Sequence, residues 1–113
     1  MLKFCNIKED NATVEYALNK LEIEIESAKL EEDVKAIKVL HGYGSHGRGG
    51  AIFNALKPKL EEWKRKKFIK DYFFGDKWNI FDKQTLKILK ADKSIYNDED
   101  LNKSNPGITI IEI

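Results

Sequence analysis

The residues best suited to chemistry lie in one glycine-rich segment near the middle of the chain. In order, its ten residues are His41, Gly42, Tyr43, Gly44, Ser45, His46, Gly47, Arg48, Gly49 and Gly50. Glycines let a bound group approach the backbone closely, and the free amides at the start of a helix attract anions. His41, His46 and Arg48 add hydrogen-bond donors and charge, and a histidine can also act as a general acid or base. We therefore predict that this segment binds phosphate, with His41 as the candidate catalytic residue if phosphodiester chemistry occurs.

Two familiar nucleotide-binding motifs fit the segment poorly. Residues 42–47 match the pattern G-x-G-x-x-G, but they follow the second predicted strand, and only Asp71 or Asp76 is available as a ribose ligand. A Walker A loop would need lysine and then serine or threonine where Arg48 and Gly49 stand. The structural alternative is a tight turn that only lets a helix pack closely on a sheet. The two histidines and the arginine favour a bound anion over that alternative.

Charge is distributed unevenly along the chain, although the net charge is only +1. Residues 1–34 carry −5, residues 35–70 carry +8 and residues 71–113 carry −2. A basic region around a glycine-rich loop is typical of a polyphosphate partner, although a solvated basic helix would explain the charge alone equally well. The basic residues expected to extend the phosphate-binding surface are Lys38, Lys57, Lys59, Lys64 and Arg65.

The hydrophobic pattern places the glycine-rich segment between a strand and a helix of an α/β domain. Apolar residues at helical spacing predict a first helix over residues 14–28, with Thr13 or Asn11 as its N-cap and an acidic outer face that repels phosphate. A second helix is predicted over residues 52–66, and Pro58 should kink it. Strands are predicted at residues 3–7, 34–40, 68–74 and 108–113. The fold class is therefore a two-layer α/β sandwich, β-α-β-α-β-(helical insertion)-β, with a four-stranded mixed sheet and two main helices.

About thirty residues separate the last two predicted strands. Residues 75–104 include a helical stretch at 82–90, and the acidic run at residues 98–100 should stay in solvent instead of binding a cation. We predict that this segment is a helical flap inserted into one domain spanning residues 1–113, because no internal repeat or linker marks a second domain.

Aromatic side chains offer further contacts for unpaired bases. Trp78 and Tyr43 lie in predicted loops, where each could stack on a base or pack against the flap. The helical phase of Trp63 instead predicts a place in the core.

Composition excludes several classes of protein. No apolar run approaches the roughly 18 to 20 residues that span a bilayer, and residues 1–5 do not resemble a secretion signal. Cys5 is the single cysteine, so it forms no internal disulfide and we expect it in the core. We therefore expect a cytoplasmic monomer that does not bind membranes.

Several segments in order resemble the small MutS-related (Smr) domain family, in particular its small free-standing bacterial members. Residues 37–44 look like the family's strand and His-Gly-x-Gly motif, residues 13–18 like the start of its first helix, and residues 107–111 like its closing strand. Residues 74–82 and 105–107 resemble the free-standing subgroup, so the similarity covers nearly the whole chain. The resemblance implies a fold like the C-terminal domain of translation initiation factor three and binding to DNA or RNA, in repair, recombination or ribosome-related roles. In some members it also implies nicking of DNA or cleavage of RNA.

One motif of that family is altered in this chain. The family's Leu-Asp-x-His falls on Cys5, Asn6, Ile7 and Lys8, so that Asn6 replaces the acid and Lys8 the histidine. An amide is a weaker base and metal ligand than a carboxylate, and lysine is protonated at neutral pH. Asn6 and Lys8 can still contact phosphate or a base, so we expect nucleic-acid binding. The alternatives are a metal-dependent endonuclease, which would use Mg²⁺ or Mn²⁺, and a small-nucleotide or protein-interaction module. No motif requires another cofactor.

Overall fold

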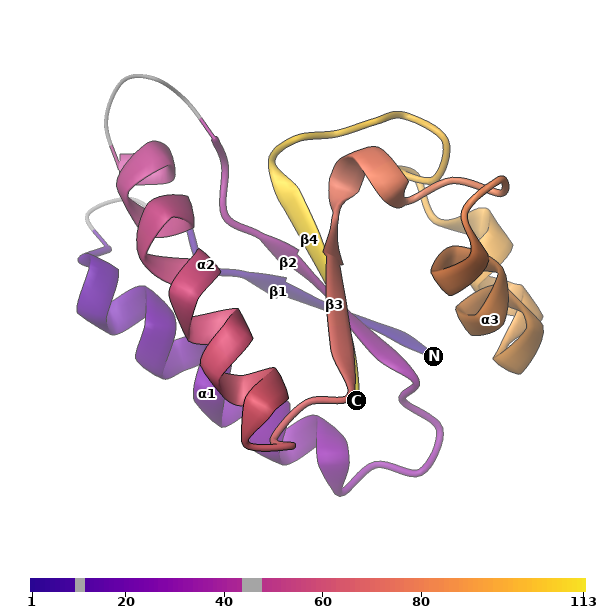
Figure 1. Cartoon of the computed structure of the whole chain (residues 1–113), viewed down its shortest axis with the longest axis horizontal. Coiled ribbons are helices and arrows are strands. Elements are labelled where there is room, and N and C mark those ends of the chain that lie inside the picture. The colour runs from indigo at the N-terminus through magenta and orange to yellow at the C-terminus, as the bar shows by residue number, and fades with distance from the viewer. Residues whose placement is uncertain (10–11, 44–47) are drawn as a thin grey trace.

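Four strands and two long helices form the α/β framework of the protein. The computed structural model describes residues 1–9, 12–43 and 48–113, without the side chain of Arg48. Its elements are, in chain order, β1 (Leu2–Asn6), α1 (Val14–Lys29), β2 (Ala36–Leu40), α2 (Arg48–Arg65), β3 (Asp71–Phe74), the 3₁₀ turn η1 (Gly75–Lys77), α3 (Lys83–Ala91), the 3₁₀ turn η2 (Lys93–Asn97) and β4 (Ile108–Glu112). The strands form one mixed sheet in the order β1-β2-β4-β3, in which β1 and β2 are parallel and β4 is antiparallel to both of its neighbours. As predicted, α1 and α2 cover one face of this sheet (Figure 1).

The first helix forms where its cap and its apolar spacing agree. Thr13 is the N-cap, and its hydroxyl oxygen accepts a hydrogen bond from the backbone N–H of Tyr16 at 3.0 Å. The buried residues of α1 recur at intervals of three or four, as one helix face requires, and are Ala17, Leu21, Ile25 and Ala28. This face packs against the sheet and α2, which confirms the predicted helix.

Cys5 lies on β1 and belongs to the same core as α1 and α2. Burial, and next the negative charge of Glu24, raises the pKa of its thiol to about 11. The thiol is therefore protonated at neutral pH, and the predicted core position of Cys5 is confirmed.

The second helix, in which a kink was predicted at Pro58, is one continuous helix through this residue and is not divided into two. The backbone donor that Pro58 lacks would have bonded to the carbonyl of Asn54, and both residues lie on the exposed side of α2. After α2 the chain turns through Lys67, whose φ of 62° is left-handed, and β3 begins only at Asp71. The predicted strand at residues 68–74 is therefore shorter than expected. Across the described part of the chain, no helix combines the length and the hydrophobicity that crossing a bilayer requires.

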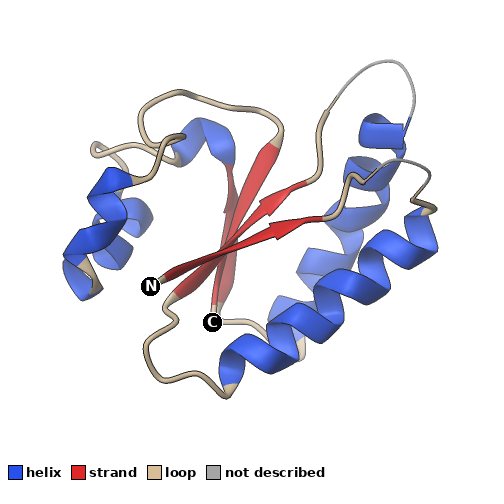
Figure 2. Ribbon diagram, turned by 180° about the vertical axis from the view of Figure 1, so that it is seen from behind, coloured by secondary structure: helices blue, strands red, loops and turns tan. Residues whose placement is uncertain are grey.

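The predicted insertion covers the opposite face of the sheet (Figure 2). Its buried residues pack on side chains of β3 and β4, and the largest of them are Trp78, Ile88, Leu89, Ile95 and Leu101. Asp82 caps α3 by accepting a hydrogen bond from the backbone N–H of Thr85 at 3.0 Å. Trp78 has no exposed surface, so it packs in this layer and is not available to stack on a base.

Lys38 joins the insertion to the sheet through its contacts with two acidic residues, and its position contradicts two predictions. Its ammonium donates to Asp98 Oδ1 and to Asp100 Oδ2, both at 2.7 Å, and the residue is only 4% exposed. Lys38 therefore does not belong to an exposed basic surface, and two residues of the run at 98–100 are not left in solvent. Asp98 Oδ2 also accepts from Trp78 Nε1 at 2.9 Å, and Asp100 Oδ1 accepts from Asn105 Nδ2 at 3.0 Å.

Candidate functional site

Part of the predicted site, namely Asn6, Lys8 and residues 41–43, lies at one edge of the sheet. Because β1, β2 and β3 run in the same direction, their carboxyl ends share this edge with the start of β4, and we call it the carboxyl edge. Asn6 is paired with Leu40 at the ends of β1 and β2, and the backbone N–H groups of His41 and Gly42 both donate to the carbonyl of Gly107 at 3.0 Å. Helix α2 starts near the same edge (Figure 1). Ligands of open α/β sheets commonly bind outside the carboxyl ends of the strands.

Part of the glycine-rich segment lies outside the described residues. The predicted contacts concerned are Gly44, Ser45, His46 and Gly47, together with the side chain of Arg48, whereas the backbone of Gly49 belongs to α2. Gly50 lies in the first turn of α2 and is partly buried. The geometry of the site is therefore built from the residues on either side of this segment.

His41 follows β2 as predicted, but its imidazole is fully buried. A carbonyl can only accept, so Nδ1 donates to the carbonyl of Gly42, and the neutral Nε2 accepts from the hydroxyl of Thr109 at 2.8 Å. The ring stacks on Phe53 of α2 with centroids 4.4 Å apart and an angle of 3° between the planes. Burial lowers the pKa of His41 and outweighs the opposing hydrogen bonds with the backbone of Gly42 and Ile108. Both ring nitrogens are used inside the protein, which suits a structural role and not the expected role in catalysis.

The buried imidazole gives a prediction about pH. The pKa of His41 is lowered in the folded protein from an ordinary value of 6.5, so the unfolded chain binds the proton more readily. The stability that neutral His41 contributes should be fully present above pH 6.5. It should be lost as the pH falls from there through the lower folded-state pKa of His41. Chemical unfolding between about pH 5 and pH 8 measures this change, and His41→Gln should flatten it. The same dependence on pH in both proteins would contradict this account of His41.

Asn6 and Lys8 form the turn that follows β1. Asn6 Oδ1 accepts a hydrogen bond from the backbone N–H of Lys8 at 3.0 Å, and its carbonyl accepts from Lys20 Nζ at 2.8 Å. The amide of Asn6 therefore shapes the turn, and the exposed side chain of Lys8 is available to a ligand. Within the described residues, no three His, Cys, Asp or Glu side chains are grouped as a metal ion would require.

The backbone beside His41 needs glycine at position 42. Gly42 has a φ of 73°, which is left-handed and disfavoured for other residues. A Cβ on Gly107 would lie 3.5 Å from Gly42 Cα and 3.6 Å from Tyr43 Cδ1, so the turn before β4 lies directly against this segment. Tyr43 is 59% exposed, and its ring is available to a ligand.

The exposed face of α2 carries the predicted basic residues. Lys57 Nζ lies 4.5 Å from the centroid of the Phe53 ring. Lys64 forms an ion pair with Asp71 at 3.1 Å, whereas Arg65 has no acidic partner among the described residues. Ion pairs with Glu62 also involve Lys59 and Lys66. Lys57 and Arg65 are therefore more available to phosphate than Lys59 and Lys64.

The sequence did not reveal the supporting residues of this site. Thr109 and Phe53 hold the imidazole of His41, and Gly107 supplies the carbonyl that orders the backbone after β2. The sequence signals were present, since Phe53 lies one helical position from the predicted core of α2 and Gly107 precedes a β-branched strand. Their partners depend on chain segments that are far apart.

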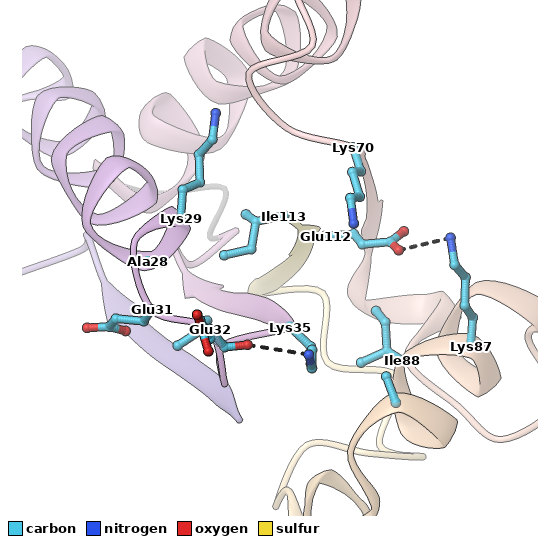
Figure 3. Close-up of a pocket in the computed structure, with 12 residues that line it drawn as sticks. Ala28, Lys29, Glu31, Glu32, Lys35, Lys70, Lys87, Ile88, Glu112 and Ile113 are labelled. Carbon is cyan, nitrogen blue, oxygen red and sulfur yellow. Dashed lines mark hydrogen bonds and ion pairs between the residues drawn. The ribbon is translucent and has the colours of Figure 1, made fainter.

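A separate groove opens at the opposite end of the sheet (Figure 3). Its volume is about 500 Å³, and its lining includes Lys29, Lys35, Lys70, Lys87 and Glu112. Lys87 and Glu112 form an ion pair across it at 3.0 Å. None of the predicted site residues lines this groove, so it is distinct from the carboxyl edge.

The fold and the carboxyl edge define an α/β domain with a candidate anion-binding site. No protein-family model, curated protein or solved structure matches this chain.

Proposed function

We propose that this protein binds nucleic acid, DNA or structured RNA, at the carboxyl edge and along the adjoining face of α2. The observation that carries the proposal is the meeting of exposed basic and aromatic side chains at this edge. Lys8 and Tyr43 follow the ends of the neighbouring strands β1 and β2. Lys57 is linked to the same edge because Phe53 lies between it and His41.

The distribution of charge supports this proposal. Residues 35–70 carry +8, and exposed cations in this region include Lys57 and Arg65 of α2. Cations that neutralise phosphates release counterions, which gives affinity without a need for a particular base sequence. The resemblance of the chain to the Smr family supports the same type of ligand.

The geometry favours binding over cleavage. The imidazole of His41 is buried with both nitrogens engaged, and Oδ1 of Asn6 closes a turn. A general base must come within hydrogen-bond distance of the proton that it removes. His41 would have to leave its contacts with Thr109 and Phe53 before it could do so.

Affinity for nucleic acid should depend steeply on salt. We expect binding of labelled RNA and DNA to weaken by at least tenfold between about 50 and 200 mM NaCl, as measured by fluorescence anisotropy. Lys8→Gln and Lys57→Gln should each weaken binding and lower the slope of log affinity against log salt by about one. Lys35→Gln is the matched control, because this exposed lysine lies at the opposite end of β2.

Three results would count against this proposal. Absent or salt-independent binding would reject it, and an equal loss with Lys35→Gln would remove the assigned surface. Cleavage of plasmid or RNA with Mg²⁺ or Mn²⁺ that His41→Gln abolishes would assign an endonuclease instead.

A further inference from the structure

A groove runs along β3, which is an outermost strand of the sheet. In the described sheet β3 pairs only with β4, so its other side is open. The groove has a volume of about 420 Å³, and its lining includes Tyr72 and Phe74 of β3, Lys64 of α2 and Lys77 of η1. It therefore combines half-buried aromatic rings with two exposed lysines.

A run of aromatic rings connects this groove to the carboxyl edge. The rings of Phe53 and Phe74 have centroids 5.4 Å apart and are nearly perpendicular, with an angle of 88°. The rings of Phe74 and Tyr72 have centroids 5.8 Å apart. Both separations are typical of aromatic contacts. We call Phe53, Phe74 and Tyr72 the aromatic strip, and it begins at Phe53, whose ring stacks on His41.

Lysines flank the aromatic strip along its length. Lys57 lies over Phe53, Lys64 lies beside Tyr72 in the groove, and Lys77 is exposed at its wall. Asp71 is the acid in the groove, and it is already engaged by Lys64 at 3.1 Å and by Gln84 Nε2 at 2.6 Å. Among the described residues Lys57 and Lys77 form no ion pair, so their ammonium groups are available to an anionic chain that lies on the strip.

The phenol of Tyr72 is uncharged at neutral pH. Burial raises its pKa, and a hydrogen bond with Glu61 raises it further. The half-buried ring is also packed against the core formed by α1, α2 and the sheet. A neutral ring held in place by packing loses little side-chain entropy when a flat ligand stacks on it.

From this arrangement we infer that Tyr72 and Phe74 of the aromatic strip form a base-stacking subsite for single-stranded nucleic acid, which follows β3 with its phosphates beside Lys57 and Lys77. The inference rests on the proposed function and narrows its ligand to strands with unpaired bases. Aromatic side chains stack on bases whose faces are open, whereas neighbouring bases cover those faces within a duplex. A single strand can therefore use the aromatic strip, and an intact duplex can use only the lysines.

The test compares oligo(U) and oligo(dT) of about 12 nucleotides with a duplex of equal length, by fluorescence anisotropy. Tyr72→Leu keeps an apolar side chain in the core and removes the ring, so single-strand affinity should fall about tenfold while duplex affinity stays within twofold. Tyr72→Phe should bind like the unmodified protein. Tyr16→Leu is the matched control, because Tyr16 is an exposed tyrosine on α1.

A second variant tests the groove without altering the core. Lys77 is exposed, so Lys77→Gln should fold normally and weaken single-strand binding by about twofold to fivefold. Unchanged single-strand affinity in both Tyr72→Leu and Lys77→Gln, or equal losses for strand and duplex in Tyr72→Leu, would overturn the subsite and leave the proposed function standing. Absence of binding to every nucleic acid would overturn both.

Discussion

Replacing Lys38 with methionine should lower the free energy of unfolding by about 3–5 kcal/mol. Methionine can occupy the space of the aliphatic stem, but it leaves Asp98 and Asp100 without the cation between them. The three charges are largely removed from solvent, with side-chain exposures of 5%, 12% and 19%. Removing one partner of a buried ion pair leaves an uncompensated charge, which costs more than the lost attraction. The insertion should detach first, because these contacts join it to β2.

Urea unfolding followed by circular dichroism measures this loss. Lys35→Met is the control, since Lys35 is exposed and its replacement should change stability by no more than about 0.5 kcal/mol. Adding Asp98→Asn and Asp100→Asn to Lys38→Met should recover part of the stability, because those changes remove the unpaired charges. A loss below about 1 kcal/mol in Lys38→Met alone would contradict the role of this network.

The same network should respond to acid. For Lys38, burial lowers the pKa, but hydrogen bonds with Asp100 and Asp98 outweigh it and raise the pKa. For Asp100, burial raises the pKa, but hydrogen bonds from Lys38 and Asn105 outweigh it and hold the pKa below the ordinary value of 3.8. The stability that Asp100 contributes is therefore present above pH 3.8 and is lost as the pH falls through its lower folded-state pKa.

The sequence predicted the framework because the framework depends on local patterns. The apolar spacing of α1 lies within its sixteen residues, and its cap, Thr13, is the residue immediately before them. Lys38 was predicted to extend the phosphate-binding surface, but lysine can be buried where it is paired with acids. Its partners lie 60 and 62 residues further along the chain, so its burial depends on how the insertion folds. No pattern near Lys38 contains that information.

The candidate site could likewise be predicted only where it follows from the strand topology. Parallel strands have their carboxyl ends at one edge, so the meeting of Asn6 and His41 follows from the predicted topology. The burial of His41 does not, because Thr109 lies 68 residues away and Phe53 approaches only when α2 packs on the sheet. The sequence thus predicted that Asn6 and His41 lie at the same edge of the sheet, but it did not predict that His41 is buried.

Gly75→Ala should lower the free energy of unfolding by about 3 kcal/mol or more. A Cβ at this position would lie 1.8 Å from the carbonyl oxygen of Asn105 and 2.8 Å from Ile108 Cγ1, and the first of these atoms belongs to the backbone. Asn105 cannot move away easily, because its side chain donates to Asp100 and accepts from the N–H of Gly107. The backbone at η1 or at this turn must therefore shift, which strains the surrounding packing.

The strain should also reach the carboxyl edge. The carbonyl of Gly107 accepts from the N–H groups of His41 and Gly42, so a displaced turn disturbs the backbone beside Tyr43. Gly107→Ala is the matched control. The only atom tighter than ordinary van der Waals contact with its Cβ would be the side-chain oxygen of Asn105, at 3.2 Å. That change should alter stability by less than about 1 kcal/mol. Thermal and urea unfolding measure the loss of stability in both variants. Equal losses of unfolding free energy in Gly75→Ala and Gly107→Ala would contradict the importance of the close approach of Gly75 to Asn105.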